Sequence, residues 1–107
     1  MKLIFHMEKE TTITINGKQL KVKQSFRSLM LFEEMTQRSV YKMNETVNDT
    51  VTLFYCILKG NNKELFTYSF DQFVDLLDDS PEYFDQFNMY LLSSAEPAAK
   101  QTKKKSN

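Results

Sequence analysis

The feature that most constrains this chain is an Asn-Gly pair between two segments of alternating apolar and polar residues, 11–15 and 18–22. Asn16 and Gly17 both accept positive φ angles, so the pair favours the two-residue type I′ turn of a β-hairpin. The antiparallel register set by that turn places four apolar side chains on one face. They are Ile13, Ile15, Leu20 and Val22. A two-stranded ribbon is marginally stable alone in water, so this face is expected to pack against the remaining chain.

The first helical segment follows the hairpin directly. Ser25 is placed to cap a helix from residue 26 to about residue 37, and the apolar residues of this segment cover most of the helical circumference. Glu34 and Arg38 are four residues apart in the order that favours an ion pair along the helix. We therefore expect this helix to be central and buried, with the hairpin covering it.

Three further helices are indicated downstream. One begins after Thr46 and is expected to stop at Gly60–Asn62, where glycine favours a left-handed C-terminal turn. Ser69 and Gln72 form a capping box at the start of the next helix. The Ser80–Pro81 pair predicts the start of the last helix, with serine as its N-cap and proline as its first residue.

The predicted fold class is therefore α+β, with an N-terminal antiparallel β-hairpin packed on about four short helices. Residues 2–7 are a candidate third strand. A chain of 107 residues has room for one hydrophobic core, so residues 1–92 are interpreted as a single domain. Residues 93–107 contain no large apolar side chain and are predicted to form a disordered basic tail.

Charge is balanced overall but divided along the chain. Fourteen Lys and Arg residues match fourteen Asp and Glu residues, yet residues 18–27 carry cations without an acid and residues 64–85 carry acids without a cation. This division argues against nucleic-acid binding, which requires a continuous basic surface. The Lys103–Lys105 run is too short and too poor in aromatic residues to change that interpretation. The first apolar run, residues 3–5, is too short for a signal peptide or a membrane span, so no membrane partner is expected.

Residues suited to catalysis are few. His6 and Cys56 are the single imidazole and the single thiol, and Cys56 is expected nearer the polar side of its helix than the core. Two glycines in the whole chain do not supply a phosphate-binding loop. Asp71, Asp75 and Asp78 share one helical face, but calcium sites wrap the ion in a loop, so a solvated acidic face is favoured over a metal site. We expect a non-enzymatic protein without cofactor or metal.

Aromatic side chains are abundant, with nine Phe and five Tyr residues. Most are expected in the core, which is the usual place of an apolar stripe at helical spacing. Tyr41 and Met43 lie in the break between two helices, and a core position and a partner contact remain equally open for them. Adaptable aromatic and Met contacts are typical of protein-binding sites. The candidate partner-binding residues are Tyr41, Met43, Tyr83, Phe84, Phe87 and Tyr90.

Four segments have an order and spacing that match a known family. Residues 12–18 have the sequence Thr-Ile-Thr-Ile-Asn-Gly-Lys, and residues 26–36 have the sequence Phe-Arg-Ser-Leu-Met-Leu-Phe-Glu-Glu-Met-Thr. Residues 55–62 end a helix on a glycine turn, and residues 69–79 contain a Ser-x-Asp-x-apolar-x-Asp-Leu-Leu pattern. In this arrangement the chain resembles the tail assembly chaperones of long-tailed, siphovirus-type bacteriophages. Residues 1–10 depart from the family pattern.

The resemblance implies a chaperone of the tape measure protein, which it would keep soluble in the host bacterial cytoplasm until the tail tube polymerises. Members of the family are absent from the mature virion. A longer form made by ribosomal frameshifting recruits the major tail protein in many members, and the Lys103–Lys105 run is where an A-rich slippery stretch would be encoded. Homo-oligomerisation is also compatible with this function.

Two other classes of protein remain open. A regulatory adaptor or inhibitor would form a stoichiometric complex with one folded partner. A structural head–tail connector or tail-completion protein would be present in purified particles. Neither class is separated from the chaperone by the residues alone.

Overall fold

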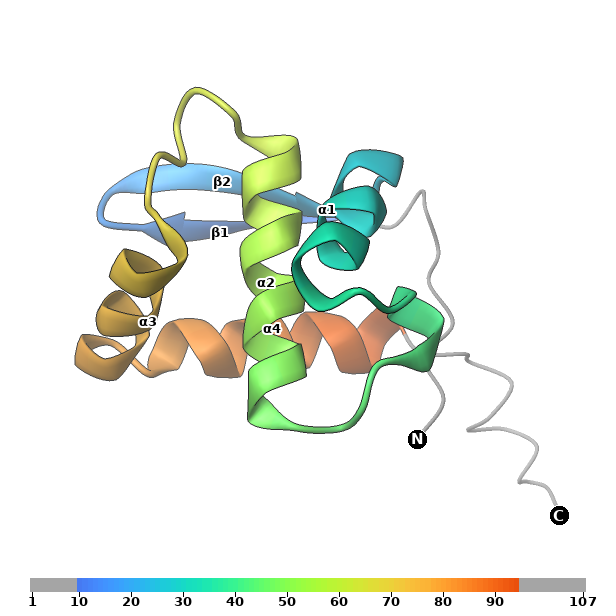
Figure 1. The fold of residues 1–107 in the computed structure, drawn as a ribbon. Coiled ribbons are helices and arrows are strands. Elements are labelled where there is room, and N and C mark those ends of the chain that lie inside the picture. The colour runs from blue at the N-terminus through green and yellow to red at the C-terminus, as the bar shows by residue number, and fades with distance from the viewer. Residues whose placement is uncertain (1–9, 95–107) are drawn as a thin grey trace, which may run out of the picture.

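The computed structural model of the protein describes residues 10–94, and these form an α+β fold (Figure 1). The elements are β1 (Glu10–Ile15), β2 (Lys18–Lys23), α1 (Phe26–Thr36), a 3₁₀ turn η1 (Val40–Lys42), α2 (Val47–Asn61), α3 (Phe70–Asp79) and α4 (Glu82–Ser94). The hairpin followed by helices was predicted from the sequence and is confirmed. The candidate strand at residues 2–7 and residues 95–107 of the predicted tail lie outside the described residues. Ser93 and Ser94, which were predicted to begin the tail, are instead the last residues of α4.

The hairpin has the predicted turn and register. Asn16 and Gly17 have φ angles of 52° and 80°, as a type I′ turn requires. Ile13 pairs with Leu20, and the four apolar residues of the predicted face are buried. The turn is also tied to the helical part, because Asn16 Nδ2 donates a hydrogen bond of 2.6 Å to the hydroxyl of Tyr68.

The central helix is α2, and the prediction that the first helix would be central is wrong. Every residue of α2 from Val51 to Leu58 is buried. Figure 1 shows α2 crossing in front of the hairpin and of α4, with α1 to its right and α3 to its left. The hairpin packs on α2 through β2, and α4 packs on β1. The hairpin therefore covers α2, where the sequence predicted that it would cover α1.

Helix α1 lies at the edge of the fold despite its many apolar residues. Only Ser28 and Phe32 are buried in it, whereas Phe26 is 75% exposed and Met30 is 67% exposed. Conversely, α2 buries Thr52 and also Cys56, which was predicted to lie nearer the polar side of the helix than the core. Thr52 donates its hydroxyl proton to the carbonyl oxygen of Asn48, so its burial leaves no unpaired polar group. Cys56 is fully buried, with its sulfur 3.7 Å from the Met35 sulfur.

Stacked aromatic rings join α2 to α3 and α4. The ring of Phe54 lies parallel to that of Phe87 at 4.3 Å between centroids and meets Phe73 edge-on at 5.0 Å. Tyr55 contacts Phe66, which lies in the connection between α2 and α3 and is buried. These ring contacts pack α3 and α4 against α2.

The helix starts follow the sequence closely. The Ser69–Gln72 capping box before α3 is present, and Ser25 caps α1 in a second box with Ser28. Thr46 Oγ1 accepts a hydrogen bond from the backbone N–H of Asp49 at the start of α2. The last helix differs by a residue or two: α4 begins at Glu82, and Ser80, predicted as its N-cap, is the C-cap of α3.

The end of α2 differs from the predicted left-handed turn. Gly60 and Asn61 continue the helix, and a Cβ atom on Gly60 would lie 3.0 Å from the backbone nitrogen of Ser28. Gly60 is thus needed for the close approach of α1. Asn62, the C-cap, accepts from the backbone N–H of Lys21 and donates to its carbonyl oxygen, each at 2.8 Å. The side-chain amide of Asn62 therefore occupies the outer edge of β2.

Arg38 and Asp49 form an ion pair that was not predicted. Arg38 lies just beyond α1, and its guanidinium donates to both carboxylate oxygens of Asp49 at 2.7 and 2.8 Å, so the predicted pairing with Glu34 is wrong. The same carboxylate accepts the backbone N–H of Asn44 at 2.6 Å. One buried acid thus holds the connection between α1 and α2 in place. The Arg38 hydrogen bonds are the main reason that the pKa of Asp49 is lowered.

We expect the Asp49→Asn variant to lose on the order of 1–2 kcal/mol of unfolding free energy at pH 7, a modest value because Arg38 is 36% exposed. The lowered pKa in the folded state means that this contribution is fully present above the unfolded value of about 3.8. It is lost as the pH falls through the folded value. Urea titrations at several pH values should show the difference from wild type shrinking in acid. Asp75→Asn, at an exposed position of α3, is the control and should show little difference at any pH.

Candidate protein-binding surfaces

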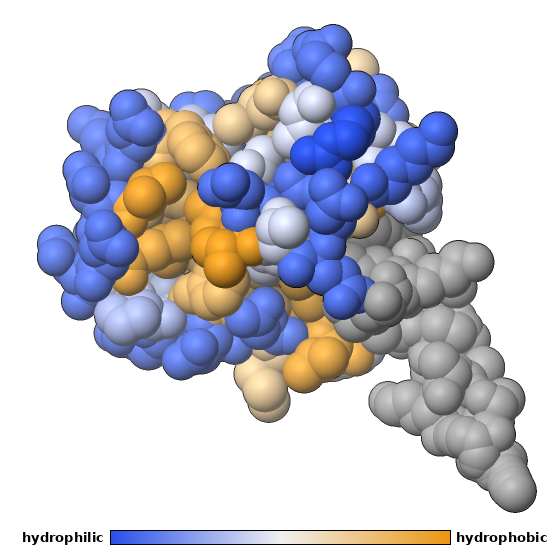
Figure 2. Space-filling view, turned by 60° about the horizontal axis from the view of Figure 1, so that its bottom comes forward, coloured by the Kyte–Doolittle hydropathy of each residue, from blue (hydrophilic) through white to orange (hydrophobic). Residues whose placement is uncertain are grey.

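A groove lined by apolar side chains lies between α2, α3 and the start of α4. We name it the α2–α3–α4 groove; its volume is about 290 Å³. Its apolar lining residues are Val47, Val51, Phe70, Val74, Leu77 and Phe84. Figure 2 shows an apolar area bordered by hydrophilic side chains on this side of the molecule. Val47 is 68% exposed, and the others are buried or half-buried at the floor and walls.

Local sequence signals position the three walls of the groove. The Thr46 cap starts α2 directly before Val47, so the first helical side chain stands at the rim. The Ser69–Gln72 box starts α3 so that Phe70 and Val74, one turn apart, face the groove while Phe73 enters the core. Pro81 lies between α3 and α4 and also lines the groove.

The surroundings of the groove are acidic. Asp78 lies in its lining, and α3 and the start of α4 carry further exposed carboxylates. These are Asp71, Asp75, Asp79, Glu82 and Asp85. Within residues 10–94, none of these side chains is in an ion pair with a Lys or Arg. An apolar groove beside unpaired negative charge therefore favours a partner with the opposite charge.

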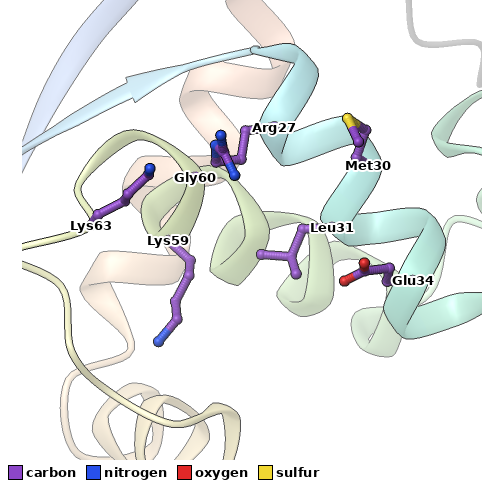
Figure 3. Close-up of a pocket in the computed structure, with 7 residues that line it drawn as sticks. All are labelled: Arg27, Met30, Leu31, Glu34, Lys59, Gly60 and Lys63. Atoms are coloured by element: carbon purple, nitrogen blue, oxygen red, sulfur yellow. The ribbon is translucent and has the colours of Figure 1, made fainter.

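A second pocket, of about 370 Å³, lies between α1 and the end of α2 (Figure 3). In Figure 3, Leu31 and Glu34 point from α1 toward α2, and Met30, which is 67% exposed, also lines the pocket. Arg27, Lys59 and Lys63 give this pocket a basic character. Lys59 is partly engaged, because its ammonium donates to the Tyr68 carbonyl oxygen at 3.4 Å and lies over the Tyr55 ring.

The six residues predicted to bind a partner are dispersed by the fold. Tyr41 is 67% exposed on η1, whereas Met43 is half-buried against the core. Tyr83 and Phe84 on α4 are also half-buried, and Phe84 lines the groove. The hydroxyl of Tyr83 accepts the backbone N–H of Asn16 at 3.3 Å.

Two of the predicted partner-binding residues belong to the core, which corrects the interpretation from sequence. Phe87 is fully buried against Phe54, and Tyr90 is buried beside Phe87. Both lie on the helix face that meets the aromatic core. Phe84 is thus the predicted residue that lies in the groove.

The aliphatic residues of the groove were not predicted as a site. Val47 and Val51 are four residues apart on α2, and both line the groove. The available signal is the position of Val47 at the first residue after the cap, where a helix seldom reaches the centre of a core. In α3 the apolar residues Phe70, Phe73 and Val74 cover more of the helix surface than the core contact uses, because only Phe73 of the three is fully buried. Such a surplus indicates a second contact surface.

The remaining chemistry of the described residues is limited. Burial raises the pKa of the Cys56 thiol to about 12, so this thiol is protonated at neutral pH. No cluster of three His, Cys, Asp or Glu side chains suited to a metal ion occurs in the described part of the chain. Among the helices of residues 10–94, none is both long and apolar enough to cross a bilayer.

Comparisons of this chain with protein-family models, with curated proteins and with solved structures found no match.

Proposed function

We propose that this protein is a non-catalytic tail assembly chaperone of a long-tailed bacteriophage or prophage. Its partner would be the tape measure protein, which it would keep soluble in the bacterial cytoplasm until the tail tube polymerises around it. The observation that carries this proposal is the order of the matching segments, from the Thr12–Lys18 hairpin through the helix at residues 26–36 to the Ser69–Asp79 helix.

The surface of the protein is compatible with a chaperone. A protein that protects an aggregation-prone client needs exposed apolar side chains that adapt to many sequences. Such side chains occur on several elements of the described chain, among them Phe26 and Met30 on α1, Val47 on α2 and Met89 on α4. Two of these four are methionines, whose flexible side chains suit contacts with low sequence demand.

Co-expression with the candidate client tests the proposed function. The client is a very large, coiled-coil-rich protein. Its gene is expected next to the gene of the present protein on the phage or prophage genome. Because exposed apolar helices of an unassembled tape measure protein would aggregate, we expect the soluble fraction of the client to rise several-fold with this protein. The measurement is the client band in the supernatant and pellet after lysis, followed by co-purification through a tag on the client.

The control is the same large protein expressed with the Phe54→Ala variant, which lacks a central core ring. A client that stays insoluble with the wild-type protein, or that is equally soluble without it, would contradict the chaperone function. Detection of the protein in purified virions in stoichiometric amounts would instead favour a structural tail component.

A further inference from the structure

The α2–α3–α4 groove has the size of a side-chain receptor. Its volume of about 290 Å³ falls at the lower limit of small-molecule sites, which span roughly 300–1,000 Å³. Apolar residues from three helices line it, and Val47 at the rim remains 68% exposed. A groove of this size is suited to a few apolar side chains projecting from a longer segment of a partner.

The walls of the groove favour a helix over an extended strand. A strand binds by pairing its backbone with a free sheet edge, and the walls here are helices whose backbone groups are already paired within each helix. Two pairs of lining residues, Val47 and Val51 on α2 and Phe70 and Val74 on α3, each stand four apart and so form a short ridge on their helix. Ridges at this spacing accept the side chains of a third helix between them.

The charge beside the groove defines the flanks of that helix. Asp78 lies in the lining, and Asp71 and Asp75 stand exposed on the same helix, without a basic partner within residues 10–94. Negative charges unpaired at a groove attract Lys and Arg residues and repel acids, which sets both the rate and the specificity of association.

We propose that the α2–α3–α4 groove binds an amphipathic helix whose apolar residues recur at positions i, i+3, i+4 and i+7 and whose flanks carry Lys or Arg. The inference rests on the proposed function for the identity of the partner, since the helix would then be a segment of the tape measure protein. The groove is then the site on this chain that binds that segment.

Two other occupants fit less well. Residues 95–107 of this chain are basic, but their apolar side chains are no larger than Ala and Pro, so they would leave the groove unfilled. A second copy would offer the exposed Phe26 and Met30 of α1. That helix carries two acids, Glu33 and Glu34, against the single cation Arg27, so its charge does not complement the acidic surroundings of the groove.

A designed peptide tests the groove. The probe is a fluorescein-labelled 18-residue helical peptide with Leu at i, i+3, i+4 and i+7 and Lys on the flanks, titrated with the full chain in fluorescence anisotropy. We expect saturable binding that weakens as salt is raised. A scrambled peptide without the apolar periodicity and a peptide with Glu in place of Lys should each bind at least about tenfold more weakly, because one loses the anchors and the other the charge match.

Val47→Asp is the decisive variant, and Leu65→Asp is its control. Val47 is 68% exposed at the rim of the groove, whereas Leu65 is 49% exposed in the connection between α2 and α3 and is not part of the groove lining, so both variants replace an exposed aliphatic side chain with the same charge. Val47 is the first residue of α2, where a carboxylate interacts favourably with the helix dipole, so the variant should fold. We expect Val47→Asp to weaken binding of the Leu–Lys peptide by about tenfold or more and Leu65→Asp to leave the affinity within about twofold.

Equal affinity of the two variants, or equal binding of the scrambled peptide, would overturn the proposal. So would a wild-type dimer in sedimentation that Val47→Asp dissociates while no peptide binds, because the groove would then be occupied by a second copy. Removal of residues 95–107 that raises peptide affinity more than about tenfold would likewise assign the groove to the tail. If the peptide binds but the co-expressed client stays insoluble, the chaperone function is refuted and the binding site in the groove is not. If Val47→Asp keeps the client as soluble as the wild-type protein does, the groove is refuted as the client-binding site and the chaperone function is not.

Discussion

Replacing Phe54 with alanine is expected to destabilise the fold more than any other single truncation considered for this protein. The ring is fully buried and contacts Phe73 and Phe87, so its loss leaves a cavity where α2, α3 and α4 meet. Large-to-small substitutions of this kind cost about 3–5 kcal/mol, against a total stability of roughly 5–15 kcal/mol for a domain. Urea unfolding followed by far-ultraviolet circular dichroism should show the midpoint falling by about 2 M.

Phe26→Ala is the matched control, because the same ring is removed from a position that is 75% exposed. Its free energy of unfolding should differ from that of the wild-type protein by less than about 0.5 kcal/mol. The two variants also test the reassignment of the central helix. A larger loss for Phe26→Ala than for Phe54→Ala would mean that α1, rather than α2, occupies the centre.

Asn62→Ala is expected to cost about 1–3 kcal/mol, because the buried Asn62 amide is lost and the backbone N–H and C=O of Lys21 lose their part-buried partner. The same amide donates to the Leu58 carbonyl oxygen at 3.0 Å, so the end of α2 is also weakened. Urea unfolding measures the loss of stability. Amide hydrogen exchange locates it, since protection of the Lys21 N–H should drop well beyond the change in global stability.

Two further substitutions separate the contributions of the amide. Asn62→Asp keeps the oxygen that accepts from Lys21 N–H and removes the donors, so exchange at Lys21 should remain partly protected while stability still falls. Asn48→Ala removes an exposed amide at the opposite end of α2 and should leave stability within about 0.5 kcal/mol of wild type. Unchanged protection at Lys21 in Asn62→Ala would show that the amide does not hold the strand.

Most interactions between residues close in sequence were predicted well, with the exceptions of the Glu34–Arg38 pair and the left-handed end of α2 at Gly60. The type I′ turn at Asn16–Gly17, the hairpin register and the Ser69–Gln72 capping box depend on the conformational preferences and hydrogen-bonding groups of a few neighbouring residues. The length of α1 was also close to its predicted extent, which was set by its Ser25 cap. The α+β class follows from these local signals taken in order.

Helix placement depended on contacts between distant residues, and the sequence predicted it poorly. The apolar circumference of α1 suggested a central helix, but periodicity records which side chains are apolar and not how many neighbouring surfaces are present to cover them. Helix α2 is apolar at every position from Val51 to Leu58 except Thr52, and all of these residues are buried. Thr52 pairs its hydroxyl within the helix, and Gly60 allows α1 to approach closely, so neither residue opposes the central position of α2.

The candidate site shows the same division. The aromatic residues of α4 indicated a region rich in contacts, but Phe87 and Tyr90 are buried in the core, and Phe84 is the one that reaches the groove. The groove forms where three helices meet, so it could not be predicted from any single segment of the sequence.

What the sequence by itself determined is the hairpin at Asn16–Gly17, the helix starts and the separation of acidic from basic segments, because each depends on neighbouring residues alone. Only the tertiary structure decided that α2 is central, that Asn62 completes the edge of β2 and that Val47 stands beside α3 at the rim of a groove. These outcomes depend on how the helices pack against one another, and packing is settled by the shapes of surfaces that come together only in the folded chain.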